Sequence, residues 1–266
     1  MALTTVRKGD LEYLVAPEIT VPHCFTTRFG GVSKGSVASL NLGMHRGDAP
    51  ENVERNYAIL AESLGFSLRH LVLTRQTHSD IVRKVSHRDA NGLDNHSYPE
   101  CDALITDEPG TALVVFTADC TPILLQDPVT GAVGAIHAGW RGTAAGLAEK
   151  TVLAMVREFG CDPANIRAAI GPNIGACCFQ TDADVPAAMR NALGEAADAF
   201  ITQKEEKYYL DLKRINAAFL QRAGVRQINI AAECTFCQSD RFWSHRKTGG
   251  DRGSQGAIIV CKEGTP

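Results

Sequence analysis

The segment from residue 103 to residue 139 constrains the fold most, because four short apolar runs follow one another there. The runs read ALITD, TALVVFTAD, PILLQD and AVGAIHAG, and the turn sequence DPVTG separates the last two. Short apolar runs rich in branched residues and bounded by turn residues are typical of β-strands. The sequence therefore predicts four strands in the middle of the chain.

Helical patterns alternate with further strand patterns on both sides of this segment. Residues 51–64 place apolar side chains at helical spacing, and Gly65 suits the end of that helix. Thr143 is predicted to cap a helix that runs to Phe159, before Gly160. Two more helices are predicted over 182–193 and 211–224, and further strands over 11–15, 21–28, 71–78, 80–86, 165–172, 228–236 and 255–260.

The order of these elements predicts the fold class. Strands and helices interleave from end to end, and neither a Pro/Gly/Ser-rich linker nor an internal repeat divides them. This pattern favours an α/β or α+β fold with residues 1–266 forming a single domain. The oligomeric state, monomer or homodimer, is left open by the sequence.

Charge and hydropathy narrow the partners and the compartment. The chain has 27 Lys and Arg against 30 Asp and Glu, a net charge of −3, which argues against nucleic-acid binding through phosphate contacts. The first fifteen residues lack the apolar core of a signal peptide. The longest apolar stretch, residues 110–125, contains Asp119 and is too short to span a membrane. We therefore expect a cytoplasmic protein with no membrane partner.

Nine cysteines at irregular spacing are an odd count, and in a reducing cytosol most should be free thiols. Most are expected to be small buried residues. Cys234 and Cys237 form a lone CxxC pair without a thioredoxin-like context, so half a zinc site or chance proximity is favoured over redox catalysis. The adjacent Cys177 and Cys178 suit a turn rather than a bridge.

Three polar side chains follow or end predicted strands, where functional groups of such folds gather. They are His78, Cys120 and His137. Imidazole and thiolate are natural zinc ligands, and three protein ligands with an open fourth position are typical of a catalytic zinc site. The same residues also allow a metal-free interpretation, with Cys120 as nucleophile and His137 as its base in a hydrolase or acyl transferase.

Other segments offer groups for binding anions. Asp119 ends an apolar strand, so its carboxylate needs partners to offset its desolvation. Trp140-Arg141-Gly142 is predicted to be a loop where backbone can approach a ligand and an arginine can bind an anion. A basic cluster around residues 244–247, together with Arg252, could bind a phosphate. No Walker-type loop or GxGxxG motif is present, so nucleoside triphosphates and dinucleotides lack support.

Six segments together resemble one family, the laccase-domain or polyphenol-oxidase-type purine nucleoside phosphorylases, which includes proteins described as peptidoglycan editing factors. The segments are TTRFGGVSKGSVASLNLG, RQTHSDIV, DALITDEPGTALVVFTADCTPILLQD, GAIHAGWRGT, AAIGPNIGACCF and FWSHRKTGGDRG. They cover the chain from about residue 20 to the C-terminus in the family's order. The combination of HAGWRGT with ADCTPILL is highly specific.

The resemblance implies roles for individual residues. The family's metal-site histidine in QxH corresponds to His78, its ADC cysteine to Cys120, and its HAGWRG histidine to His137. Substrate- or phosphate-binding roles are implied for four further residues: Arg28, Asn41, Arg141 and Arg246. The resemblance also implies a layered α-β-β-α domain with mixed sheets, similar to the cysteine-dependent toxin deamidases.

The activity implied is phosphorolysis of adenosine, inosine and methylthioadenosine to the free base and ribose 1-phosphate or its methylthio analogue, with deamination of adenosine as a second reaction. Zinc is the metal expected at the Cys/His/His site, copper is the other candidate, and inorganic phosphate is the co-substrate. One alternative is a Cys-His amide hydrolase that edits peptidoglycan precursors. A second is copper-dependent phenol oxidation, which the sequence disfavours because none of its eight histidines forms a His-x-His pair.

Overall fold

The structure, a computed structural model, describes residues 2–262 and contains two six-stranded sheets. The first sheet has the order β1-β2-β3-β15-β7-β4. Its strands are β1 (Thr4–Lys8), β2 (Leu11–Val15), β3 (His23–Thr26), β15 (Gln255–Val260), β7 (Ala112–Thr117) and β4 (Leu71–Leu73). Neighbouring strands are antiparallel except β4, which is parallel to β7. The sheet is therefore mixed.

The second sheet is mixed as well, with the order β14-β10-β8-β9-β6-β5. Its strands are β14 (Gln227–Ile230), β10 (Arg167–Ile170), β8 (Thr121–Gln126), β9 (Val133–Ala138), β6 (Ala103–Thr106) and β5 (Val82–Lys84). The two edge strands are parallel to their neighbours, β14 to β10 and β5 to β6, and the other pairings are antiparallel. All four apolar runs of the central segment form strands, as predicted, and three of them lie in this sheet.

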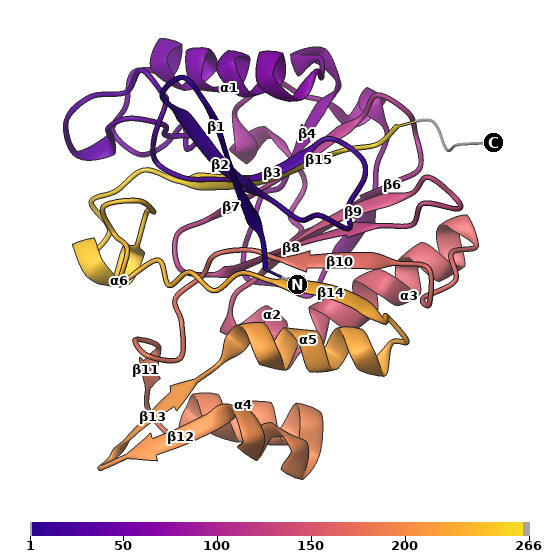
Figure 1. The fold of residues 1–266 in the computed structure, drawn as a ribbon, viewed down its shortest axis with the longest axis vertical. Coiled ribbons are helices and arrows are strands. Elements are labelled where there is room, and N and C mark those ends of the chain that lie inside the picture. The colour runs from indigo at the N-terminus through magenta and orange to yellow at the C-terminus, as the bar shows by residue number, and fades with distance from the viewer. Residues whose placement is uncertain (1, 263–266) are drawn as a thin grey trace.

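The two sheets pack face to face with helices outside them (Figure 1). Helix α1 (Pro50–Leu64) covers the first sheet, and α3 (Leu147–Phe159) and α5 (Leu212–Arg222) cover the second. Strand β8 shows why its sequence is apolar throughout: Leu124 points into the core shared with the first sheet, whereas Ile123 and Leu125 point into the core under the helices. Because both faces are buried, an alternating polar pattern is absent. The predicted mixed, layered arrangement is confirmed.

Two helix predictions have different outcomes. Helix α1 ends at Leu64, and Gly65 adopts φ 72°, the left-handed conformation expected of a glycine after a helix. The predicted cap at Thr143 is wrong, because α2 (Trp140–Ala144) already begins after Gly139, and Gly146 separates α2 from α3. Thr143 is fully buried, and its hydroxyl accepts a hydrogen bond from Asn216 of α5 at 2.9 Å. Its side chain therefore makes a tertiary contact instead of capping a helix.

The strand predicted over 228–236 is β14, which ends at Ile230. Two other differences from the prediction lie close to predicted site residues. The strand predicted over 71–78 ends at Leu73, and residues 75–79 form a loop. Trp140-Arg141-Gly142, predicted as a loop, is the first turn of α2. Both differences concern the chain next to His78 and His137, so they change how the site is held.

A small third sheet and two further helices complete the fold (Figure 1). The sheet has the order β11-β13-β12, with β11 (Gln180–Thr181), β12 (Ile201–Lys204) and β13 (Lys207–Leu210). Helix α4 (Asp184–Leu193) lies beside it, and α6 (His245–Thr248) precedes β15. No helix within residues 2–262 has the length and hydropathy needed to cross a membrane.

Candidate active site

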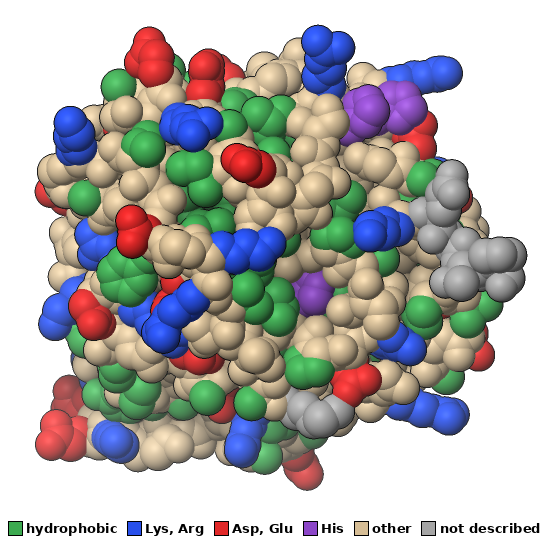
Figure 2. Space-filling model, turned by 45° about the horizontal axis from the view of Figure 1, so that its top comes forward, with side chains coloured by type: hydrophobic (Ala, Val, Ile, Leu, Met, Phe, Trp, Pro, Cys, Tyr) green, Lys and Arg blue, Asp and Glu red, His purple; other side chains and the backbone are tan. Residues whose placement is uncertain are grey.

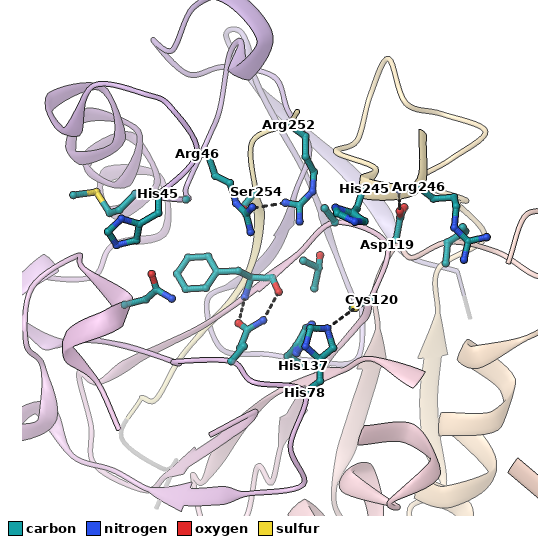
Figure 3. A pocket seen from close by; sticks show the side chains of 18 of the residues that line it. His45, Arg46, His78, Asp119, Cys120, His137, His245, Arg246, Arg252 and Ser254 are labelled. Atoms are coloured by element: carbon teal, nitrogen blue, oxygen red, sulfur yellow. Dashed lines mark hydrogen bonds between the residues drawn. The ribbon is translucent and has the colours of Figure 1, made fainter. Parts of the chain in front are cut away.

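His78, Cys120 and His137 lie together although they are far apart in the sequence (Figure 3). His78 lies on the loop after β4, Cys120 in the turn between β7 and β8, and His137 near the end of β9. The Cys120 Sγ lies 3.8 Å from His78 Nε2, and the two imidazole rings meet edge to face with centroids 5.1 Å apart. The three ligand atoms lie within 4.8 Å of one another. We call these residues the Cys/His/His trio.

The backbone around the trio adopts conformations that few residues tolerate. His78 has φ 60° and Asp119, directly before Cys120, has φ 90°, both in the left-handed region. Gly139 lies between the two loops, and a Cβ there would come within 2.7 Å of His78 Cδ2. Such strained residues occur where the surrounding structure fixes them firmly, often at functional sites. The trio is therefore held in a defined arrangement.

Asp102, the residue directly before β6, is fully buried and holds this arrangement together. Its Oδ1 accepts hydrogen bonds from His137 Nδ1 at 2.7 Å and from the backbone N–H of His78 at 3.2 Å. Its Oδ2 accepts from the N–H of Thr77 and from both the N–H and the hydroxyl of Ser79. Burial raises the pKa of Asp102, but these partners outweigh it and lower the pKa, so the carboxylate stays ionised.

Asp102 is not among the site residues predicted from the sequence, although its position beside an apolar strand carries a signal. Asp119 was singled out because a carboxylate beside an apolar strand needs partners. Those partners are present: the Thr235 hydroxyl donates to Asp119 Oδ1 at 2.6 Å, and the N–H of Arg246 donates to Oδ2 at 2.7 Å. Asp102 also lies directly beside an apolar run, ALIT, so its carboxylate likewise needs hydrogen-bond partners.

The charges within the trio favour a thiolate on Cys120. Burial alone would raise the pKa of the Cys120 thiol, but the charge and hydrogen bonds of His137 and His78 lower it to about 6. Burial likewise lowers the pKa of His137, while the Cys120 and Asp102 charges raise it to about 9. A thiolate beside an imidazole with a fixed Nδ1–H is suited either to binding a metal or to nucleophilic attack.

The trio lies in the wall of a cavity of about 640 Å³, within the usual range for small-molecule sites. One part of the wall is apolar and includes Phe116, Ile174 and Phe179. Another part is basic and comprises Arg46, His245, Arg246 and Arg252 (Figure 3). On the face of the molecule drawn in Figure 2, Lys and Arg side chains are interspersed with Asp and Glu. The cavity therefore combines a metal-type donor set, an apolar surface and a cluster of basic side chains.

Arg252 is half-buried in this basic part of the wall. Its guanidinium donates to the Gly253 carbonyl and to the Ser254 hydroxyl, but its buried Nε has no hydrogen-bond partner among the described residues. Burial and the neighbouring charge of Arg46 lower the pKa of Arg252 to about 10. Two close guanidinium cations in a cavity wall suit an anionic ligand.

Three of the four predicted binding residues do not line the cavity. The guanidinium of Arg28 stacks on Trp243 at 4.0 Å and donates to the carbonyls of Ala38 and Ser239. Arg141 lies over the ring of its neighbour Trp140 on α2. Arg246 does line the cavity. Substrate contact by Arg28 and Arg141 stays a prediction that this geometry does not support.

Asn41, the remaining residue of that set, is fully buried and acts on the cavity wall indirectly. Its Oδ1 accepts from the N–H of Gly43 at 2.9 Å and from the N–H of Ser254 at 3.0 Å, and both of these residues line the cavity. Its amide nitrogen donates to Asp48. Asn41 therefore joins two loops that are more than two hundred residues apart in the sequence.

The chain matches one family model, described as multi-copper polyphenol oxidoreductase laccase, over residues 22–262. It belongs to this family. The laccase-domain resemblance drawn from the six sequence segments is thereby confirmed.

Curated relatives in this family carry the name purine nucleoside phosphorylase. One from Deinococcus radiodurans is 41% identical over 94% of this chain and 92% of its own length. YlmD from Geobacillus stearothermophilus is 40% identical over 88% of this chain and 87% of its own, and YfiH from Escherichia coli is 35% identical over 88% and 93%. The similarity extends over nearly the full length of each relative.

Solved structures of laccase-domain proteins share the fold. The crystal structure of YlmD from Geobacillus stearothermophilus has a TM-score of 0.91 at 36% identity and covers 97% of this chain and 99% of its own. A Neisseria meningitidis protein has a TM-score of 0.79 at 33% identity, with 98% and 100% covered. Similarity to the toxin deamidases stays a prediction.

Proposed function

We propose that this laccase-domain protein is a purine nucleoside phosphorylase that acts on adenosine, inosine and methylthioadenosine at the cavity that holds the trio. One observation carries the proposal: the same cavity wall presents a cation cluster for phosphate, an apolar surface for a purine, and a Cys/His/His donor set. The names of the curated relatives support the same activity.

In phosphorolysis, an oxygen of inorganic phosphate bonds to C1′ of the sugar while the bond from C1′ to the purine nitrogen breaks. The base leaves with the electron pair and takes up a proton, and the sugar leaves as its 1-phosphate. Arg252 and Arg46 would bind the phosphate, with Arg246 and His245 on the same part of the wall. Held dianionic phosphate also stabilises the positive charge that develops at C1′.

The trio is placed to act on the purine end of the substrate. Phe116 and Phe179 offer apolar surface against which a purine ring can pack, and they exclude water from the bond that breaks. The departing base needs a proton or a Lewis acid, and the imidazoles of His78 and His137 are the groups of that kind nearest to Cys120.

The donor set fits a zinc ion. Asp102 accepts from His137 Nδ1, which leaves the Nε2 of that ring for a ligand, and Cys120 favours the thiolate. Metal binding would displace the proton shared by Cys120 and His137. His78, Cys120 and His137 would hold the ion, and when bound it supplies Lewis acidity toward the base or toward an attacking water. The latter supports the adenosine deaminase activity that we also assign to this cavity.

Chromatography of adenosine and inosine incubated with the protein, with and without inorganic phosphate, tests the proposal. We expect phosphate-dependent release of adenine and hypoxanthine, and phosphate-independent formation of inosine from adenosine. Cys120→Ala should abolish both, whereas Cys161→Ser, at a buried cysteine that does not line the cavity, should retain both. Full activity and full zinc content in Cys120→Ala would contradict the assignment.

A second candidate function rests on the hydrogen bond from His137 to Asp102, because Asp, His and Cys then stand in the order of a hydrolase triad. In a Cys-His amide hydrolase that edits peptidoglycan precursors, Cys120 would react with iodoacetamide whether or not a chelator is present. A zinc-bound thiolate should react only after the metal is removed. Phenol oxidation by copper-loaded protein tests the activity named in the family's description.

A further inference from the structure

Four cysteines outside the cavity wall gather at one point where two turns meet. Cys177 and Cys178 lie in the turn before β11, and Cys234 and Cys237 lie in the turn after β14. Their sulfur atoms all lie within 4.8 Å of one another, and the Cys237 Sγ lies 3.3 Å from Cys178 Sγ and 3.6 Å from Cys177 Sγ. The CxxC pair thus has a second pair of cysteines after all, supplied by the fold.

We propose that these four cysteines bind a second metal ion, a structural zinc held by four thiolates. A tetrahedral site with zinc–sulfur bonds of about 2.3 Å places its sulfur atoms about 3.8 Å apart. The Sγ–Sγ separations of 3.3 and 3.6 Å lie just below this value and the other sulfur pairs lie within 4.8 Å, so small side-chain rotations would complete the tetrahedron. Zinc is the metal of choice because four soft thiolates in this geometry select zinc or iron, and CxxC is a common zinc-binding pair.

Contacts at and beside Cys234 suit a metal-bound sulfur. The N–H of Gly175 donates to Cys234 Sγ at 3.2 Å, the kind of backbone contact that stabilises a metal-bound sulfur. A Cβ on Gly175 would meet Cys234 Cβ at 3.2 Å and Cys177 Sγ at 3.3 Å, so a glycine allows this close approach. The buried ammonium of Lys213 donates to the carbonyl of Glu233, next to Cys234, and places a positive charge near a site whose zinc complex carries two negative charges.

The position of the cluster indicates what the ion would do. Cys177 and Cys178 lie between Ile174 and Phe179, which both line the cavity. On the other side, the hydroxyl of Thr235, next to Cys234, donates to Asp119 in the turn that carries Cys120. A metal here would join the two turns and fix one wall of the cavity without contacting the substrate.

Metal content per chain tests the proposal with a readout other than activity. Protein purified under reducing conditions should contain about two zinc ions per chain, one at the trio and one at the four cysteines. Cys237→Ser should remove one, His78→Ala should remove the other, and the matched control Cys161→Ser should remove neither. If zinc is lost only in His78→Ala, and the four clustered thiols react with a thiol reagent in the folded protein, the second site is refuted. The assignment of zinc to the trio would still hold.

Cobalt substitution keeps the proposal testable if Cys237→Ser does not fold. Wild-type protein loaded with cobalt should show thiolate-to-cobalt charge-transfer absorption of a four-thiolate site, and this absorption should persist in Cys120→Ala. Absorption that disappears entirely in Cys120→Ala would mean that cobalt binds only at the trio, and the second site would be refuted. Disulfides among the four cysteines that persist in folded protein purified under reducing conditions would refute the second site as well.

Discussion

Replacing Asp102 by asparagine tests whether one buried carboxylate holds the trio together. The carboxylate accepts five hydrogen bonds, two at Oδ1 and three at Oδ2. The amide nitrogen of an asparagine cannot accept, so at least two of these bonds are lost in either orientation of the side chain. If the nitrogen takes the place of Oδ1, it faces His137 Nδ1 and favours the wrong imidazole tautomer.

The magnitude follows from the number of bonds lost. A hydrogen bond to a charged group contributes about 1.5–3 kcal/mol, so two lost bonds should lower the free energy of unfolding by about 3 kcal/mol or more. In a chain of this size each kcal/mol lowers the melting temperature by about 2–4 °C, which predicts a decrease of about 6–12 °C. Loss of a carboxylate behind a ligating histidine should also weaken zinc binding about 10–100-fold.

Thermal unfolding followed by circular dichroism, together with zinc retention during dialysis against a chelator, measures both effects. Asp107→Asn is the matched control, because Asp107 lies five residues along the same segment and is exposed. If Asp102→Asn melts within about 2 °C of this control and retains zinc equally well, Asp102 neither stabilises the fold nor orients His137.

Four further predictions test other parts of the molecule. Gly139→Ala should displace His78 and lower zinc content and phosphorolysis while the melting temperature changes little; normal zinc content would show that the loop can yield. Arg252→Gln should raise the KM for phosphate about tenfold or more with less effect on the KM for inosine, and equal changes in both would contradict a phosphate role. Leu124→Ala, in the core between the sheets, should lower the free energy of unfolding by about 2–5 kcal/mol in urea titrations. Burial raises the pKa of Glu12, but Arg241 and Arg7 outweigh it and lower the pKa. The ionised Glu12 therefore stabilises the fold at neutral pH, and this stabilisation is lost as pH falls through the lowered pKa. Glu12→Gln should flatten the acid side of the curve of unfolding free energy against pH, and parallel curves for variant and wild type would refute this.

The sequence predicted the buried parts of the fold better than the exposed ones. Apolar runs such as PILLQD form β8 because both faces of that strand are covered, so burial and sequence carry the same information. The third sheet was missed because β12 and β13 come from ITQKEEKYYL, a largely exposed polar segment without alternation. Pairing between these strands depends on the tight turn at Glu205, which adopts φ 54°, rather than on hydrophobic pattern.

The sequence predicted the three residues of the trio but not the hydrogen bonds that hold the site in place. Imidazole and thiolate groups that follow apolar runs are visible in one dimension, and the structure brings all three together. Arg28 and Asn41 were assigned to the ligand on resemblance, yet their side chains bind other parts of the chain. Contacts of this kind join residues more than two hundred positions apart, and no local pattern records them.

Two buried carboxylates explain how loops without regular structure can hold the trio. Backbone N–H groups in a strand are satisfied by the neighbouring strand, but residues 77–79 leave β4 and lose that partner. Asp102 takes its place by accepting the N–H groups of all three residues and the Nδ1–H of His137. Asp119 likewise binds the N–H of Arg246, 127 residues away. Because an ionised carboxylate accepts several hydrogen bonds and donates none, each one fixes donors from separate segments, and the trio is positioned before any ligand binds.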